Sequence, residues 1–179
     1  MSSFLNRISN WKTLLGLLII YFLFPSVWFR HAGEKISQLA GKEIGPVDLT
    51  FGFNPKRTLQ MIEDYGEAGR TYYRFVEMTI DIIYPIVYCT FFAVLLTMIY
   101  RSLLRGPVKY LNMVPFAAMV FDFLENISIV SMINHYPEQS IFIATLCELF
   151  KMLKWLMFGL VLFLVIFGLF KVLTRKRHA

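Results

Sequence analysis

The sequence predicts an all-α polytopic membrane protein, a four-helix transmembrane bundle with a short helical cap on its outer side. Of its 179 residues, 57% are hydrophobic and 17% are charged, whereas a soluble domain is usually about 45–50% apolar and about 25% charged. Four stretches with few charges are each long enough to cross a hydrocarbon core of about 30 Å as a helix. These stretches are residues 13–29, 78–100, 110–134 and 141–170. A water-soluble enzyme is therefore not expected.

The first span follows Arg7 and Lys12, as the apolar part of a signal peptide would. It ends in the sequence Ser26-Val-Trp-Phe-Arg30, which lacks the small-x-small pattern of a cleavage site. We therefore expect a retained signal anchor, and we expect residues 1–179 to form one membrane domain.

The segment of residues 30–76 is the only sizeable polar stretch and is predicted to form the outer cap. Within it, Asn54 and Pro55 are typical of a helix N-cap followed by proline at the first helical position. The apolar residues that follow predict a short amphipathic helix at about 55–65. Upstream, residues 47–53 alternate loosely between apolar and polar side chains and are predicted to be extended.

The second membrane helix is expected to begin outside the bilayer, because no helix breaker occurs between Glu67 and Pro85. Pro85 itself removes the backbone hydrogen bond that the carbonyl of Asp81 would otherwise accept. Unpaired backbone at membrane depth is tolerated only against protein or water. We therefore expect an interior, hydrated pocket beside Asp81, open toward the outer side.

The distribution of basic residues predicts that both termini are cytoplasmic. One side of the membrane would hold residues 1–12, 101–109 and 171–179, with nine basic residues and no acidic one. Residues 30–76, on the other side, carry seven basic and six acidic residues. Short loops rich in Lys and Arg stay in the cytoplasm. The formal net charge of +6 is therefore attributed to stop-transfer clusters, and no nucleic-acid partner is expected.

Cys89 and Cys147 lie inside apolar spans and are expected to remain reduced. Counting from the inner end of each span at about 1.5 Å per residue separates their depths by about 18 Å. A disulfide requires Cα atoms within about 7 Å of each other.

Six ionisable side chains occur inside the spans: Asp81, Asp122, Glu125, Glu148, Lys151 and Lys154. Each is costly in a bilayer, by about 2.5–3.5 kcal/mol, and usually faces the interior of the bundle. The same count of depth places Glu125 and Lys154 roughly 24–26 Å from the inner end. Because the third and fourth spans are antiparallel neighbours, Glu125 and Lys154 are the preferred ion pair. Asp81 and Lys151, near 30 Å, form a second expected pair.

Helical spacing places the polar side chains on shared faces. Asp122, Glu125 and Asn126 are neighbours at i, i+3 and i+4, and similar stripes occur on the second and fourth spans. The predicted ligand-binding residues are Asp81, Tyr84, Tyr88, Asp122, Glu125, Asn126, Glu148, Lys151 and Lys154.

Four carboxylates against two lysines leave two negative charges uncompensated inside the membrane. They are neutralised by protonation, by Arg30 or Arg74 reaching in, by a bound cation or by a ligand amine. No histidine lies in any span, so the Glu-x-x-His pattern of a di-iron bundle is absent and no metal site or cofactor is predicted. No sequence motif of nucleophilic catalysis is present.

Three motifs follow one another along the chain: Gly66-x-x-Gly69-Arg70-x-x-Tyr73, Asp81-x-x-Tyr84-Pro85-x-x-Tyr88 and Asp122-x-x-Glu125-Asn126. In these motifs the chain resembles small four-span bacterial membrane proteins. The resemblance covers about residues 47–155 and implies a bacterial inner (plasma) membrane, without an activity. In architecture, the chain is also similar to the sterol-isomerase and sigma-2-receptor superfamily. Its members bind amphipathic amines or sterols with carboxylates inside the membrane. This chain has no acidic residue in its first span, so that similarity concerns architecture alone.

Three functions are compatible with these residues. The first is a membrane protein whose polar pocket binds a lipid-like or amine ligand or a membrane-protein partner. The second is an intramembrane enzyme acting on a lipid-like substrate, in which Asp81, Asp122 or Glu125 is the general acid or base and Tyr84 or Tyr88 orients the substrate. The third is a structural scaffold, in which the polar network only holds the helices together.

Overall fold

The computed structural model describes residues 2–101, 103 and 108–176, and within these residues every regular element is helical. In chain order the elements are α1 (Ser2–Ile8), α2 (Trp11–Leu23), η1 (Phe24–Phe29), α3 (Arg30–Ala40), η2 (Val47–Leu49), α4 (Pro55–Asp64), α5 (Gly66–Met78), α6 (Ile80–Arg101), η3 (Val108–Met113), α7 (Val114–Asn134) and α8 (Ile141–Lys176).

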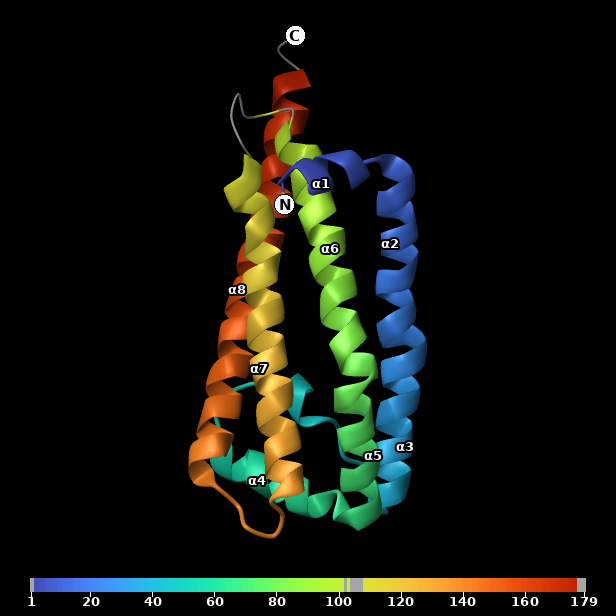
Figure 1. Cartoon of the computed structure of the whole chain (residues 1–179), viewed down its shortest axis with the longest axis vertical. Helices are drawn as coiled ribbons and strands as arrows, with labels where there is room; N and C mark the ends of the chain where they lie inside the picture. The colour runs from blue at the N-terminus through green and yellow to red at the C-terminus, as the bar shows by residue number, and fades with distance from the viewer. Residues whose placement is uncertain (1, 102, 104–107, 177–179) are drawn as a thin grey trace.

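Four helical rods are long and apolar enough to cross a membrane, which confirms the predicted fold class. They cover Trp11–Ala40, Gly66–Arg101, Tyr110–Asn134 and Ile141–Arg175. Figure 1 shows the rods running between two ends of the molecule, with α1 and the end of α8 at one end and α4 across the other. We call the α4 end the cap end. Of the basic residues in the predicted charge pattern, Arg105 and Arg177 lie outside the described residues.

The first rod begins after Asn10, whose side chain accepts hydrogen bonds from two backbone N–H groups of the first turn. It continues through the π-helical turn η1, which contains Pro25, and through α3. The helix therefore extends eleven residues beyond the predicted end at position 29, and the first part of the expected cap belongs to this rod. It ends at Gly41, whose left-handed backbone (φ 68°) closes the helix.

The loop from residue 41 to 54 contains a 3₁₀ turn where an extended segment was predicted. Val47 is buried there, but the other apolar residues of the alternation, Leu49, Phe51 and Phe53, are exposed. The alternation therefore does not mark a strand with one buried face. Tyr73 fixes the turn instead, because its hydroxyl accepts a hydrogen bond from the Val47 N–H and donates one to the Asp48 carboxylate.

The predicted cap helix is confirmed as α4, which follows the N-cap residue Asn54. Gly66, with φ 65°, allows the turn between α4 and α5. Beside this turn the buried Tyr65 hydroxyl donates to the Gly45 carbonyl at 2.9 Å. Burial raises the pKa of the Tyr65 phenol well above its usual value, so this group stays a hydrogen-bond donor.

The second rod begins at Gly66, outside the predicted span, as expected. It consists of α5 and α6, which meet at Thr79, where the backbone leaves helical geometry (φ −128°, ψ −78°). The break lies between Glu77, in the last turn of α5, and Asp81, in the first turn of α6.

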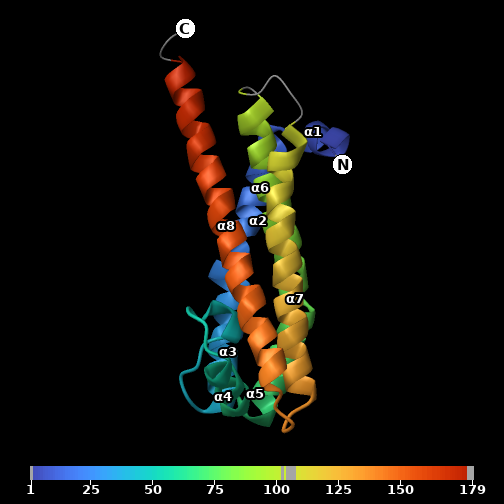
Figure 2. The ribbon, with the colours of Figure 1, turned by 90° about the vertical axis from the view of Figure 1, so that its left-hand side faces the viewer.

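The last helix, α8, contacts α7 at the cap end and α6 toward the opposite end. A Cβ on Gly168 of α8 would lie 2.5 Å from a methyl group of Ile99, so glycine permits the contact with α6. The Tyr100 hydroxyl adds a hydrogen bond of 2.9 Å to the Leu164 carbonyl. Figure 2 shows α8 inclined to α7, with their ends close at the cap end and separated at the other end. Cys89 and Cys147 are buried and free, in agreement with the sequence prediction.

Candidate functional site

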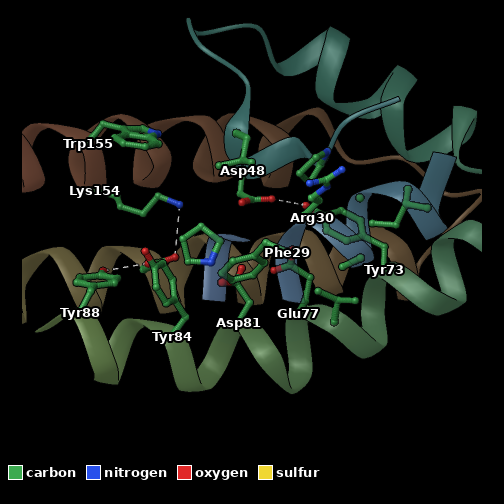
Figure 3. A pocket seen from close by; sticks show the side chains of 18 of the residues that line it. Phe29, Arg30, Asp48, Tyr73, Glu77, Asp81, Tyr84, Tyr88, Lys154 and Trp155 are labelled. Carbon is green, nitrogen blue, oxygen red and sulfur yellow. Dashed lines mark hydrogen bonds and ion pairs between the residues drawn. The ribbon is translucent and has the colours of Figure 1, made fainter. Parts of the chain in front are cut away.

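A cavity of about 410 Å³ lies near the cap end, among all four rods and the loop before α4. We call it the central cavity. Most of its wall is apolar or aromatic, contributed by Tyr21, Pro25, Phe29, Ala32, Gly33, Ile36, Pro46, Leu49, Tyr73, Val76, Tyr84, Tyr88, Trp155 and Phe158. The charged residues in the wall are Arg30, Asp48, Glu77, Asp81, Asp122 and Lys154. Figure 3 shows most of these charged side chains around the cavity, with Asp48 across it from Asp81.

Five of the predicted ligand-binding residues line this cavity: Asp81, Tyr84, Tyr88, Asp122 and Lys154. They come from α6, α7 and α8. Tyr84 belongs to an aromatic group with Phe24 and Phe29 of η1, with ring centroids 5.3 and 5.1 Å away. The sequence stripe on α6 therefore faces the first rod as well as α7.

The predicted Glu125–Lys154 ion pair is present. Lys154 Nζ lies 2.5 Å from Glu125 Oε2 and 3.4 Å from Asp122 Oδ1. Asp122 also accepts a hydrogen bond of 3.0 Å from the Tyr88 hydroxyl. One lysine thus serves two carboxylates. Glu125 is fully buried behind Lys154 and does not line the central cavity.

The predicted pair between Asp81 and Lys151 is wrong. Lys151 Nζ lies 2.6 Å from Glu148 Oε1, on its own helix, and donates to Thr50 Oγ1 at 2.7 Å. Equal depth did not determine the partner, because the cap supplies a nearer one. Lys151 lies one turn closer to the cap end than Lys154, where Glu148 and Thr50 hold its ammonium group. Of the two lysines, only Lys154 lines the central cavity.

Glu148 and Lys151 instead join the cap to α8. Glu148 accepts hydrogen bonds from the Thr58 hydroxyl at 2.6 Å and from the Asn54 N–H at 3.0 Å. With the bonds of Lys151 to Glu148 and Thr50, every charged group of this cluster has a partner. We call the cluster of Thr50, Asn54, Thr58, Glu148 and Lys151 the cap clamp.

Asn126 satisfies the backbone carbonyl that Pro85 leaves unpaired. Its Nδ2 donates to the carbonyl of Asp81 at 2.9 Å, so the acceptor expected from the sequence is used between α6 and α7. Asn126 does not line the central cavity.

Two carboxylates beside the α5–α6 break have no cation. Asp81 is 6% exposed, and its carboxylate forms no hydrogen bond or ion pair with the described residues. Glu77 is 1% exposed, and neither of its oxygens has a hydrogen-bond partner in the described part of the chain. A buried carboxylate without a partner is costly.

The two arginines considered from the sequence do not compensate them. Arg30 lines the edge of the cavity but pairs with Glu34 at 3.0 Å, where both side chains are exposed. Arg74 donates to the side chain of Asn134 at 2.9 Å, between α5 and α7. Neither arginine therefore pairs with Asp81 or Glu77 in the folded protein.

The sequence prediction missed Glu77, Asp48 and Tyr73. Glu77 was placed outside the second span, although it lies four residues before Asp81 and extends the same helical stripe. No pattern pointed to Asp48, because the loop that carries it reaches the cavity through the contacts of Val47 and Asp48 with Tyr73.

The described residues hold no group of three or more His, Cys, Asp or Glu side chains arranged for a metal ion. No protein-family model, curated protein or solved structure matches this chain. The resemblance to small four-span bacterial membrane proteins stays a prediction. The chemistry of the central cavity is therefore inferred from the side chains that line it.

Proposed function

We propose that the central cavity binds an amphipathic ligand with a cationic amine. The observation that carries this proposal is the unpaired carboxylate of Asp81 in the cavity wall, backed by the unpaired Glu77. An ammonium group supplies both the positive charge and the hydrogen-bond donors that these oxygens lack.

The rest of the wall suits the apolar part of such a ligand. Ligand pockets are generally apolar, with a few polar groups that fix orientation, and aromatic faces attract cations. The cavity, at about 410 Å³, is within the range of about 300–1,000 Å³ that small-molecule sites occupy. Its place among helices that cross a membrane favours a ligand drawn from the bilayer.

The proposal is tested with dodecylamine, dodecanol and dodecanoate added to the protein in nanodiscs, with thermal stability as the measurement. We expect the amine to raise the melting temperature in a saturable way, and the alcohol and the carboxylate to do so much less. Asp81→Asn should abolish the preference for the amine. Glu63→Gln, which neutralises an exposed carboxylate in the cap, is the matched control and should retain it.

Asp81→Asn is informative because it should leave the fold intact. The bond from Asn126 goes to the backbone carbonyl of Asp81, and the substitution removes an unpaired buried charge. If the amine stabilises Asp81→Asn as strongly as the unmodified protein, the proposal is wrong. A polar network that only joins the helices would give that result. Chemical change of a bound lipid, lost in Asp122→Asn, would instead indicate an enzyme.

We also propose that both termini lie in the cytoplasm, and that the membrane is a bacterial inner (plasma) membrane. The support for orientation is that α1, the end of α6 and the end of α8 lie together at the end opposite the cap. Basic residues gather there, including Arg7, Lys12, Arg101 and Lys171. The support for the membrane is the sequence resemblance alone.

A further inference from the structure

Trp155 in the wall of the central cavity carries a hydrogen-bond donor that the protein does not use. Its indole Nε1 is buried, and it has no acceptor in the part of the chain that the structure describes. A buried tryptophan usually places this N–H against an acceptor, and an unmade hydrogen bond of a buried donor is costly. The ring itself is held by packing, since it stacks on Phe51 at 5.6 Å and meets Phe158 edge-on at 6.1 Å.

The unused donor and the unpaired carboxylates lie at different parts of one cavity. Figure 3 shows Trp155 beside Lys154 toward one end, Glu77 toward the other, and Asp81 between them. A ligand whose ammonium pairs with Asp81 and Glu77 therefore extends past Trp155. A hydrogen-bond acceptor at that point of the ligand would satisfy the indole N–H.

The acceptor must be neutral. The carboxylates of Asp48 and Asp122 also line this cavity, and the charge of Lys154 is already shared between Asp122 and Glu125. A phosphate or carboxylate on the ligand would meet these acidic groups, while Arg30, at the edge of the cavity, already pairs with Glu34. An ester or amide carbonyl accepts a hydrogen bond and adds no charge.

We propose that the ligand is an aminoacyl amphiphile, with an ammonium group near an ester or amide carbonyl on a long apolar chain, and that Trp155 determines this specificity by donating to the carbonyl. The inference rests on the proposed amine site and adds a second polar contact to it.

The test compares dodecyl esters of glycine and β-alanine with tetradecylamine, using isothermal titration calorimetry on the protein in nanodiscs. The two esters vary the spacing between ammonium and carbonyl. A hydrogen bond between an N–H and a neutral acceptor should make at least one ester bind about fivefold to tenfold more tightly than the amine. Trp155→Phe, which keeps an aromatic ring against Phe51 but has no N–H, should remove this gain, so that in the variant the esters bind no more tightly than tetradecylamine does.

The outcomes separate the two proposals. If no amine binds saturably to the unmodified protein, both the amine site and this inference are wrong. If tetradecylamine binds but neither ester gains affinity, or if the gain persists in Trp155→Phe, only the role of Trp155 is wrong. The N-acetylated glycine ester, which lacks the ammonium, should not bind measurably to either protein. The melting temperature of Trp155→Phe without ligand verifies that its fold is retained.

Discussion

The side-chain amide of Asn126 donates a hydrogen bond of 2.9 Å to the backbone carbonyl of Asp81, the carbonyl that Pro85 deprives of its helical partner. The proline and the asparagine are therefore coupled, although they lie on different helices. One removes a hydrogen bond from α6, and the other replaces it from α7.

This coupling predicts the effect of Asn126→Leu. The substitution leaves a buried carbonyl unpaired and should lower the free energy of unfolding by about 1–3 kcal/mol. In a Pro85→Ala background the residue at 85 regains an N–H for that carbonyl, so the same substitution should cost clearly less. Unfolding by SDS in mixed micelles measures both values. Equal losses in the two backgrounds would show that the Asp81 carbonyl is not the shared acceptor.

Because Lys154 is shared by two carboxylates, removing one of them should restore only part of the stability that is lost when Lys154 is replaced. Lys154→Met leaves Glu125 and Asp122 without a cation and should cost about 3–5 kcal/mol of stability. Adding Glu125→Gln should recover part of the loss, and adding Asp122→Asn as well should recover more. Thermal melts of the purified variants measure the series. Strictly additive losses along it would contradict the shared ion pair.

The cap clamp predicts that one hydroxyl stabilises the cap. Thr58→Val keeps the side-chain shape but removes a donor to Glu148, and should cost about 1–3 kcal/mol. The loop of residues 41–54 should then become more sensitive to protease. Thr145→Val is the control, because its hydroxyl bonds only to a carbonyl of its own helix. Equal protease sensitivity in both variants would argue against the clamp.

The two cysteines should be unreactive in the folded protein. Cys89 is 1% exposed and Cys147 is 0% exposed. A maleimide reacts with a thiolate that it can reach, and these buried thiols are not accessible to it. N-Ethylmaleimide should label neither residue before denaturation and both after it, as counted by mass spectrometry. A disulfide in the native protein would show that the register of α6 or α8 is wrong.

The charge distribution predicts topology. Single cysteines at Lys42 and Glu63, in a protein without Cys89 and Cys147, should react with an impermeant maleimide added outside intact cells. Cysteines at Arg7 and Arg175 should react only after the membrane is permeabilised. The reverse labelling would mean that the asymmetry of basic residues does not orient this protein.

Much of the architecture could be predicted from the sequence because it depends on local properties. Lengths of apolar residues identify the spans, and Asn54 with Pro55 identifies the start of α4. The length of the first rod was harder to predict, since the polar sequence that begins at Arg30 suggested a cap segment, while the helix continues through η1 to Ala40. For residues 47–53, the alternation was real but its apolar members face outward, with Phe51 84% exposed.

The partners in the candidate site could be predicted only where two residues share the same membrane depth and their side chains also point toward each other. Glu125 and Lys154 lie on facing sides of antiparallel neighbours, so a count of residues was sufficient to pair them. Lys151 has a similar depth to Asp81 but points under the cap, and its partner Thr50 is distant in sequence. Asp48 enters the cavity wall through a loop held by Tyr73, a tertiary contact that no sequence pattern encodes.

The cap clamp has a consequence for biogenesis. On a newly inserted α8, Glu148 and Lys151 have only each other as partners until residues 50–58 add the bonds of Thr50, Asn54 and Thr58, and charged groups inside a membrane are costly where they face lipid. The charged pair on α8 therefore gains all of its hydrogen bonds only after the extramembrane segment made earlier in synthesis has folded over it. A chain with a damaged cap would therefore keep a charged pair uncovered on its last helix.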